Sequence, residues 1–246
     1  MGDTVVGTAV RHLYREGPKA FLERLIPFVY NNLIRTRMPV TGRTTVNYNE
    51  VEIPTDQHYL DDYVPFAGDR PHYEKVLIEA IIENIREGDN VCIVGGGNGV
   101  SAVTTARSVS TAGSITVFEA AKSRTKLIED TAVLNDVGGI VDVTHSIVGE
   151  NIDVWGEESG AKITPPSDLP DPDWLVLDCQ GSEKQILREI TPGPKIIVET
   201  HGFLGSWPDE VKSILGDQGY RIISSEPAHG HSKRDGCVVL VAAPVR

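Results

Sequence analysis

The chain has no apolar run of 18 residues, few cysteines, and fewer basic than acidic residues. Without such a run it contains no candidate for a membrane-spanning helix, which needs about 20 apolar residues. No unbroken apolar stretch follows the first residues, so no secretory signal is expected. We therefore expect a soluble cytoplasmic protein, and any membrane contact would be peripheral.

Cysteine is rare, and its few positions exclude most of the chemistry that thiols perform. Cys92, Cys179 and Cys237 each fall in a stretch that is predicted to be a buried strand. A small apolar thiol packs well at such a place, whereas disulfide pairing and metal ligation are hard to arrange there. We expect three core residues without a redox role.

Basic residues are scarce relative to acidic ones: 23 Lys and Arg oppose 35 Asp and Glu, and the formal net charge is −12. A general nucleic-acid binder needs an electropositive surface to displace counterions, so we expect no nucleic-acid partner. The excess of carboxylates also suits a cytoplasm of high salt, where hydrated acidic side chains keep proteins soluble. A halophilic protein of this kind would gain stability in molar KCl.

Positive charge gathers near the start of the chain, in residues 11–43, which hold seven Arg or Lys and two Glu. Apolar side chains recur at three-to-four spacing in residues 7–36, which predicts a helix with a break at Pro27. Two interpretations of this arm stay open. It packs on the protein as an ordinary helix, or its basic amphipathic surface contacts a membrane or a protein partner.

A short hairpin and one large α/β domain are expected after this helical segment. Residues 44–53 alternate as a hairpin does, so residues 1–66 form a predicted N-terminal arm and residues 67–246 the main domain. Apolar runs there alternate with amphipathic segments, which builds a mostly parallel, doubly wound sheet with helices on both faces. One strand is predicted to start at residue 91, and six more are predicted at 115–119, 141–147, 174–179, 195–200, 220–225 and 237–243. Helices are predicted at 71–87, 100–109, 122–134, from 183 onward, and at 208–216.

The last two predicted strands break the alternation. Only the nine or so residues 228–236 separate them, too few for a crossover helix, so the last strand must run antiparallel beside its neighbour. A seven-stranded, mostly parallel sheet with an antiparallel last strand resembles the class I methyltransferase fold and is not expected of a nicotinamide-binding domain. The segment 149–172, rich in Gly, Pro and acid, is either a substrate lid or a surface excursion.

A glycine-rich turn follows the first strand of the domain, where residues 91–99 read V-C-I-V-G-G-G-N-G. Glycine permits positive φ and removes the Cβ atoms that would keep a ligand off the backbone, and the helix after the turn offers free N–H groups. About twenty residues later, the strand 114–119 ends in Glu119, where an acid usually holds the two hydroxyls of a ribose. The pattern predicts a nucleotide-type ligand.

The turn alone does not choose that ligand. Residues 97–102 match the dinucleotide pattern G-x-G-x-x-A, and residues 95–99 match the G-x-G-x-G of S-adenosylmethionine sites. A dinucleotide-binding domain usually begins close to its first strand, whereas about ninety residues come before it here. An NAD(P)-dependent oxidoreductase, in which Glu119 would hold the adenosine ribose, therefore stays open as the less favoured alternative.

A more specific signal lies in residues 174–201. They contain W-L-V-L-D-C-Q-G-S-E, from Trp174 to Glu183, and then I-I-V-E-T-H, which ends at His201. This block resembles the FkbM family of S-adenosylmethionine-dependent methyltransferases, whose members carry I-D-V-E-G-A-E followed by a helix and an I-V-E-x-H strand. The resemblance extends from about Asn90 to Ala243.

The resemblance implies S-adenosylmethionine as the cofactor and an acceptor hydroxyl on a sugar, a glycolipid or a small metabolite. It also implies where the parts of the cofactor would lie. Gly95, Gly97 and Gly99 would face the methionine part, Glu119 the ribose, and Ser146 with Ile147, at the end of the third strand, the adenine.

Two residues depart from the family pattern. Methyltransferases commonly have an acid two residues before the first glycine, and this chain has Ile93; the family has Glu after the fourth strand, and this chain has Gln180. Without the first acid, the ammonium group of the cofactor lacks a partner, so an aspartate in place of Ile93 is expected to tighten cofactor binding. A catalytically weakened protein that serves as a binding partner or scaffold is a third interpretation.

The carboxyl ends of the parallel strands also collect candidate catalytic groups. Glu183 and Glu199 would lie there beside Asp178 and His201. Either Asp178 or His201 is suited to act as the general base that deprotonates a hydroxyl. The plain alternatives are that Asp178 caps the helix starting near Glu183 and that His201 is a loop histidine whose hydrogen bonds are satisfied within the protein.

The loop after the sixth strand carries His229 and His231, with Lys233 and Arg234 close behind. A His-x-His pair with a nearby Asp is able to hold a divalent metal, although solvated turn residues are the simpler interpretation. We expect no metal in the site.

Overall fold

The computed structural model describes residues 44–55, 68–149, 160–229 and 235–245. The chain divides into two compact units, residues 1–46 with 55–68 and residues 47–54 with 69–246. The predicted helix at 7–36 and the basic arm at 11–43 lie outside the described residues. The second unit contains the sheet and the helices that position the candidate site.

The predicted hairpin is present. Strands β1 (Thr45–Tyr48) and β2 (Val51–Pro54) form a two-stranded sheet. The two residues that join them, Asn49 and Glu50, have φ angles of 48° and 64°. Two successive residues at positive φ match the twist of the flanking strands, as two-residue hairpin loops require.

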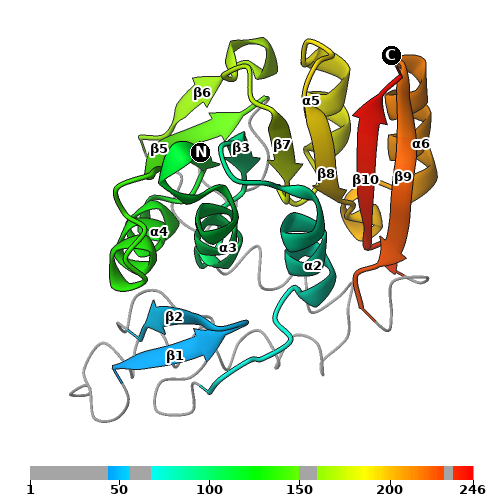
Figure 1. Ribbon diagram of the computed structural model, residues 1–246. Coiled ribbons are helices and arrows are strands. Elements are labelled where there is room, and N and C mark those ends of the chain that lie inside the picture. The colour runs from blue at the N-terminus through cyan, green and yellow to red at the C-terminus, as the bar shows by residue number, and fades with distance from the viewer. Residues whose placement is uncertain (1–43, 56–67, 150–159, 230–234, 246) are drawn as a thin grey trace, which may run out of the picture. The chain divides into compact units, whose positions relative to one another are not determined.

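One eight-stranded sheet forms the centre of the second unit, in the order β6-β5-β4-β3-β7-β8-β10-β9 (Figure 1). Neighbours from β6 to β8 run parallel, whereas β10 runs antiparallel to both β8 and β9. The strands are β3 (Asn90–Val94), β4 (Ser114–Glu119), β5 (Val141–Val148), β6 (Lys162–Thr164), β7 (Trp174–Leu177), β8 (Lys195–Glu199), β9 (Tyr220–Pro227) and β10 (Val238–Pro244).

The doubly wound arrangement and the antiparallel last strand are confirmed, but the count of seven strands was one too low. The additional strand is β6, which pairs with residues 146–148 of β5 at the edge of the sheet. Only three residues long and largely exposed, β6 has no apolar alternation by which a strand is recognised in sequence. Residues 160–172 of the proposed lid or excursion thus hold an edge strand and the short turn η4 (Pro166–Asp168).

Helices cover both faces of the sheet. Helices α2, α3 and α4 pack side by side on one face, and α5 and α6 on the other (Figure 1). None of the described helices is long and apolar enough to cross a membrane. The helices are α2 (Lys75–Asn84), α3 (Val100–Val109), α4 (Lys122–Leu134), α5 (Glu183–Glu189) and α6 (Pro208–Asp217), with short 3₁₀ turns η3 (Ser110–Ala112) and η5 (Gly202–Leu204).

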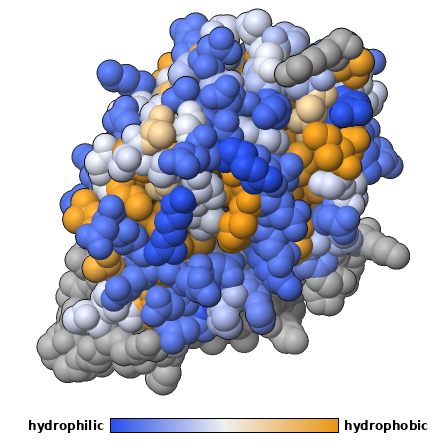
Figure 2. Space-filling view, in the orientation of Figure 1, coloured by the Kyte–Doolittle hydropathy of each residue, from blue (hydrophilic) through white to orange (hydrophobic). Residues whose placement is uncertain are grey.

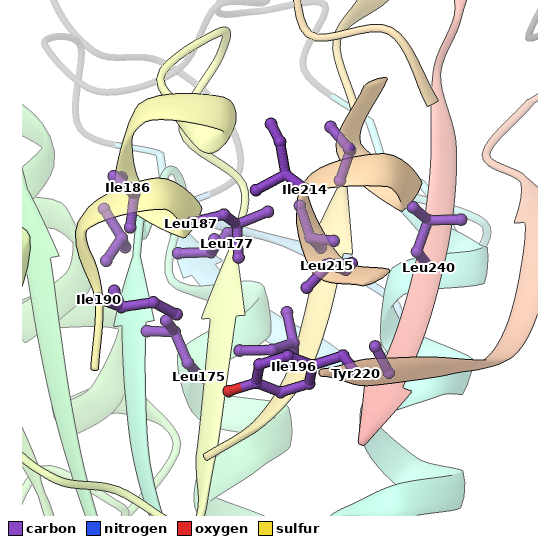
Figure 3. Close-up of a cluster of buried hydrophobic side chains, with 14 of the residues drawn as sticks. Leu175, Leu177, Ile186, Leu187, Ile190, Ile196, Ile214, Leu215, Tyr220 and Leu240 are labelled. Atoms are coloured by element: carbon purple, nitrogen blue, oxygen red, sulfur yellow. The ribbon is translucent and has the colours of Figure 1, made fainter. Parts of the chain in front are cut away.

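A hydrophobic core fills the space between the sheet and helices α5 and α6 (Figure 3). Leu175 and Leu177 of β7 meet Leu187 of α5 and Leu215 of α6 there, and these side chains are almost fully buried. Because side chains alternate along a strand, Val176 points to the opposite face, toward α2 and α3. Strands β7 and β8 are therefore buried on both faces, which fixes the positions of the residues that follow them.

On the face shown in Figure 2 the surface is mainly hydrophilic, with hydrophobic side chains in separate patches. The three cysteines are free thiols, and Cys92 and Cys237 are buried as expected. Cys179 is half-buried and follows β7 instead of lying within it. Burial raises the pKa of the Cys92 thiol to about 12, so this group is inert near neutral pH.

Candidate active site

The candidate site lies at the carboxyl edge of the sheet, where the strand order reverses between β3 and β7. The chain runs from β3 outward to β4 and β5, then returns to the other side of β3 as β7. Ligands of open α/β sheets bind at such a switch point. The glycine turn follows β3 and Asp178 follows β7, and the Asp178 N–H donates to the carbonyl of Val94 at 2.9 Å.

The glycines of the turn serve different purposes. Gly95 has a φ of +89°, and a Cβ on it would lie 1.9 Å from the main-chain oxygen of Asp178. A Cβ on Gly96 would lie 2.4 Å from Cδ1 of Ile128. Gly97, with a φ of +51°, has no atom within 4 Å of its Cβ position and is exposed. Packing therefore requires the first two glycines, and only Gly97 faces open space.

Glu119 is bound to the glycine turn. Its Oε2 accepts hydrogen bonds from the N–H groups of Gly96 and Gly97 at 3.0 and 3.1 Å. Its Oε1 accepts from the N–H of Ala121 at 2.9 Å. An ionised carboxylate offers about four acceptor positions, so one position is left for a ligand. The carboxylate fixes the turn whether or not it also holds a ribose.

The predicted adenine residues stand near the end of β5. The Ser146 hydroxyl lies 2.8 Å from the carbonyl oxygen of Lys162 and 2.7 Å from Oγ1 of Thr164, so it binds the edge strand β6. Ile147 beside it is buried. The hydroxyl of Ser146 is thus engaged within the protein, and an adenine contact here remains a prediction.

Asp178 after β7, Glu183 at the start of α5 and His201 after β8 lie together; Glu183 and His201 are buried, and Asp178 is partly buried. Nδ1 of His201 lies 2.7 Å from Oε1 of Glu183, and Nε2 lies 3.5 Å from Oδ1 of Asp178. Residue 182, and not Asp178, stands at the cap of α5, which has no side-chain cap hydrogen bond. Asp178 therefore does not cap α5, whereas the hydrogen bond to Glu183 agrees with a satisfied loop histidine at His201 as well as with a catalytic one.

Burial and mutual charge shift the pKa values of these groups. Burial raises the pKa of Asp178 to about 6 against the opposing effect of His201, and burial with the Asp178 charge raises that of Glu199 to about 8. Burial alone would lower the pKa of His201, but Glu183 and the other carboxylates raise it to about 9. At neutral pH the imidazole is therefore charged, and Asp178 is mostly ionised.

Glu183 behaves differently from the other acids. Burial alone would raise its pKa, but the hydrogen bond and charge of His201 and the N–H of Gly181 lower it below the ordinary value. Both carboxylate oxygens accept from that N–H, at 3.0 and 2.9 Å. Glu183 and His201 thus form a charged, hydrogen-bonded pair in the interior.

Two site residues were missed from sequence. Tyr73 and Glu74 precede α2 in a turn, where the sequence predicted that the helix had already begun, and Glu74 has a φ of 48°. Burial and the charge of Asp178 raise the pKa of Glu74 well above its ordinary value. The Tyr73 hydroxyl forms a hydrogen bond with the side chain of Glu74, and it accepts a hydrogen bond from Nδ2 of Asn98 at 3.2 Å. Tyr73 thereby joins the carboxyl groups to the glycine turn.

Exposed apolar side chains border the site. Phe203, Leu204 and Trp207 are 61%, 43% and 45% exposed, and they follow His201 directly. The Phe203 ring meets the His201 ring edge-on, with centroids 5.9 Å apart. Gln180, at the turn after β7, is exposed with a φ of 51°, a strained conformation for a residue with a side chain.

The remaining sequence candidates lie elsewhere. Ile93 is fully buried, with Val117 and Val176 as its partners in β4 and β7. His229 is exposed, and His231 lies outside the described residues. Among the described residues, no group of three or more His, Cys, Asp or Glu is arranged to hold a metal ion.

The strand order, the switch point at β3 and the antiparallel β10 define the class I methyltransferase fold. No protein-family model and no curated protein matches the chain. Among solved structures, the chain is similar to a ribosomal protein L11 methylase from Lactobacillus delbrueckii subsp. bulgaricus, with 13% identity, 70% of this chain and 79% of the other covered, and a TM-score of 0.48.

The chain is also similar to two further solved structures. A SAM-dependent methyltransferase from Aquifex aeolicus has 17% identity, with 70% of this chain and 89% of the other covered and a TM-score of 0.46. An O-methyltransferase from Bacillus cereus in complex with SAH has 14% identity, 69% and 80% coverage, and a TM-score of 0.44.

Proposed function

We propose that the chain is an S-adenosylmethionine-dependent methyltransferase. The observation that supports this most is the meeting of the glycine turn and Asp178 on the two sides of the switch point, where Gly95 touches the main chain of Asp178. A ligand bound at the exposed Gly97 would lie at the same edge of the sheet as the carboxylate of Asp178. That arrangement suits a donor bound on the turn and an acceptor beside Asp178.

The residues present fit this cofactor. Gly97 leaves open space at the turn, and Glu119 keeps one acceptor position for a ribose hydroxyl. The predicted holders are Gly95, Gly97 and Gly99 for the methionine part, Glu119 for the ribose, and Ser146 with Ile147 for the adenine. The charges of Glu183 and His201 offset each other, so the carboxylate of Asp178 leaves the site with a negative charge, which favours a cationic sulfonium ligand.

The chain itself has to position the acceptor and to take up one proton. When bound, the cofactor supplies a methyl group on a sulfonium, which is already activated, so alignment of the reacting atoms provides much of the rate. A hydroxyl that took up the methyl group would have to release its proton, and the chain has to supply the group that receives it. Asp178 is the proposed acceptor of the hydroxyl proton, since its pKa of about 6 leaves it ionised at neutral pH.

The finer proposal is an enzyme of FkbM type that methylates a hydroxyl oxygen of a sugar, a glycolipid or a small metabolite. It rests on the sequence block from Asp178 to His201, whose ends meet in space. The exposed side chains of Phe203, Leu204 and Trp207 offer an apolar surface to such an acceptor. The net charge of −12 supports the absence of a nucleic-acid partner, and the basic residues 11–43 support a peripheral membrane or protein contact.

Isothermal titration calorimetry with S-adenosylhomocysteine and, separately, with NADH tests the proposal. We expect heat only with S-adenosylhomocysteine. Heat with NADH alone would replace the methyltransferase by an oxidoreductase. No heat with either, at millimolar ligand, would point to the weakened binding or scaffold protein that the buried Ile93 and the exposed Gln180 leave as the alternative.

A further inference from the structure

Resting on the proposed function, we propose that Glu183 is a positioning residue for His201. Its hydrogen bond to Nδ1 would hold the imidazole so that Nε2 faces Asp178. His201 then serves as a fixed donor, and Asp178 is left as the group that accepts the proton of the acceptor hydroxyl.

The contact with Glu183 fixes a proton on one ring nitrogen of His201. Glu183 is fully buried, and its carboxylate accepts hydrogen bonds from Gly181 and lies 2.7 Å from Nδ1 of His201. A carboxylate in that bonding pattern only accepts, so the proton of the contact belongs to Nδ1. The nitrogen that remains for the site is Nε2.

Asp178 lies beyond ordinary hydrogen-bond distance from the His201 ring. Nε2 of His201 lies 3.5 Å from Oδ1 of Asp178, which is longer than the usual N–H···O range of 2.7–3.2 Å. The two groups attract each other by charge, but the carboxylate is not consumed by a short hydrogen bond. Asp178 therefore keeps an oxygen with which to accept a proton from a bound hydroxyl.

Ser206 links the two chain segments that carry Glu183 and His201. Ser206, which is fully buried, donates its hydroxyl to the carbonyl of Gly181 at 3.0 Å. Its N–H donates to the carbonyl of His201 at 3.1 Å. Ser206 thus ties the loop of His201 to the turn that binds Glu183. The pair is fixed from both sides, as a positioning role requires and a chance contact does not.

Nitrogen-15 NMR of the histidine rings in the full chain tests the proposal, with His201→Gln identifying the His201 signals. In the wild type we expect an Nδ1–H resonance that is protected from exchange with water, and a ring pKa well above that of an ordinary histidine. In Glu183→Gln that resonance is lost, and the proton affinity of the ring falls at least tenfold. Glu183→Asp restores part of both signals, because it keeps a carboxylate near Nδ1.

Glu189→Gln, the same substitution at an exposed position of α5, serves as the control and should leave the His201 signals unchanged. If Glu183→Gln does not fold, Asp178→Asn decides: the Nδ1–H resonance persists there, since its partner is Glu183. A wild-type ring without a proton on Nδ1, or a folded Glu183→Gln with unaltered His201 signals, overturns the proposal. The NMR readout needs no cofactor, so failure of the calorimetry with S-adenosylhomocysteine is seen separately.

Discussion

Gly95 and Asp178 are in direct main-chain contact, although 83 positions separate them in the sequence, because a Cβ at residue 95 would lie 1.9 Å from the Asp178 carbonyl oxygen. The contact joins the glycine turn to the end of β7. The proposed cofactor-binding turn and the proposed proton acceptor therefore cannot move apart independently.

Gly95→Ala should be strongly destabilising. The added methyl meets the main chain of Asp178, and the φ of +89° is unfavourable for alanine. Backbone strain and overpacking each cost about 1–3 kcal/mol, so urea denaturation should show a loss of about 2 kcal/mol or more. Gly216→Ala, in α6 with open space around its Cβ position, is the control and should stabilise by up to about 1 kcal/mol. Equal midpoints for the two variants would contradict this account of the turn.

Glu119→Gln should weaken binding of S-adenosylhomocysteine. Three main-chain N–H groups donate to the carboxylate, and an amide replaces one acceptor oxygen by a donor that faces them. Hydrogen bonds to charged groups contribute roughly 1.5–3 kcal/mol, so we expect at least about a tenfold rise in Kd by calorimetry. Glu129→Gln, exposed on α4, should have the wild-type affinity; an unchanged Kd for Glu119→Gln would remove the residue from the site.

The domain should lose stability as the pH rises from about 5 to 9. Burial and Asp178 raise the pKa of Glu199 to about 8, and Glu183 with the other carboxylates raises that of His201 to about 9 against burial. In both cases the folded protein binds the proton more tightly than the unfolded chain, so stability is present below the unfolded pKa and is lost as the pH rises through the folded pKa.

Glu199→Gln should flatten the part of this decline that lies between about pH 5 and 8, because an amide stays neutral throughout. Urea denaturation at several pH values measures the slope, with Glu226→Gln on the exposed part of β9 as the control. A slope for Glu199→Gln that is as steep as that of the wild type would show that Glu199 does not titrate in this window.

Ile93→Asp was expected from sequence to tighten cofactor binding, and the structure leads to a different expectation. Ile93 is fully buried between Val117 and Val176, so an aspartate would place an unpaired carboxyl in the core. The cost should be at least about 3 kcal/mol by urea denaturation. Ile93→Val should cost only about 1 kcal/mol. A stable Ile93→Asp that binds S-adenosylhomocysteine more tightly would restore the first expectation.

Sequence periodicity predicted most strands of the sheet to within two residues, and it predicted the bounds of two helices without error. The bounds of α3 and α4 agree with the prediction, since a glycine starts the first and apolar spacing carries the second. Strand β6 was not predictable in this way, because its three residues are held by the edge of β5 and by the hydroxyl of Ser146.

The site residues that follow strands were predictable from the sequence, whereas those that reach the site from the turn before α2 were not. Asp178 and His201 follow buried strands, so their meeting was expected from topology. Tyr73 and Glu74 reach the same place from a turn before α2, and the left-handed φ of Glu74 has no sequence signal in a residue other than glycine or asparagine. The charge of His201 was also not predictable, because it depends on the hydrogen bond with Glu183 and the nearby carboxylates, which together outweigh the effect of burial.

Strand β7 is hydrogen-bonded to β3 and β8, and strand β8 is hydrogen-bonded to β7 and β10. Their main-chain amides should therefore exchange with deuterium only in molecules that have unfolded as a whole, whereas the edge strands β6 and β9 exchange through local opening. Since Asp178 and Glu199 stand at the ends of these two central strands, the distance between the two acids should change only when the whole domain unfolds.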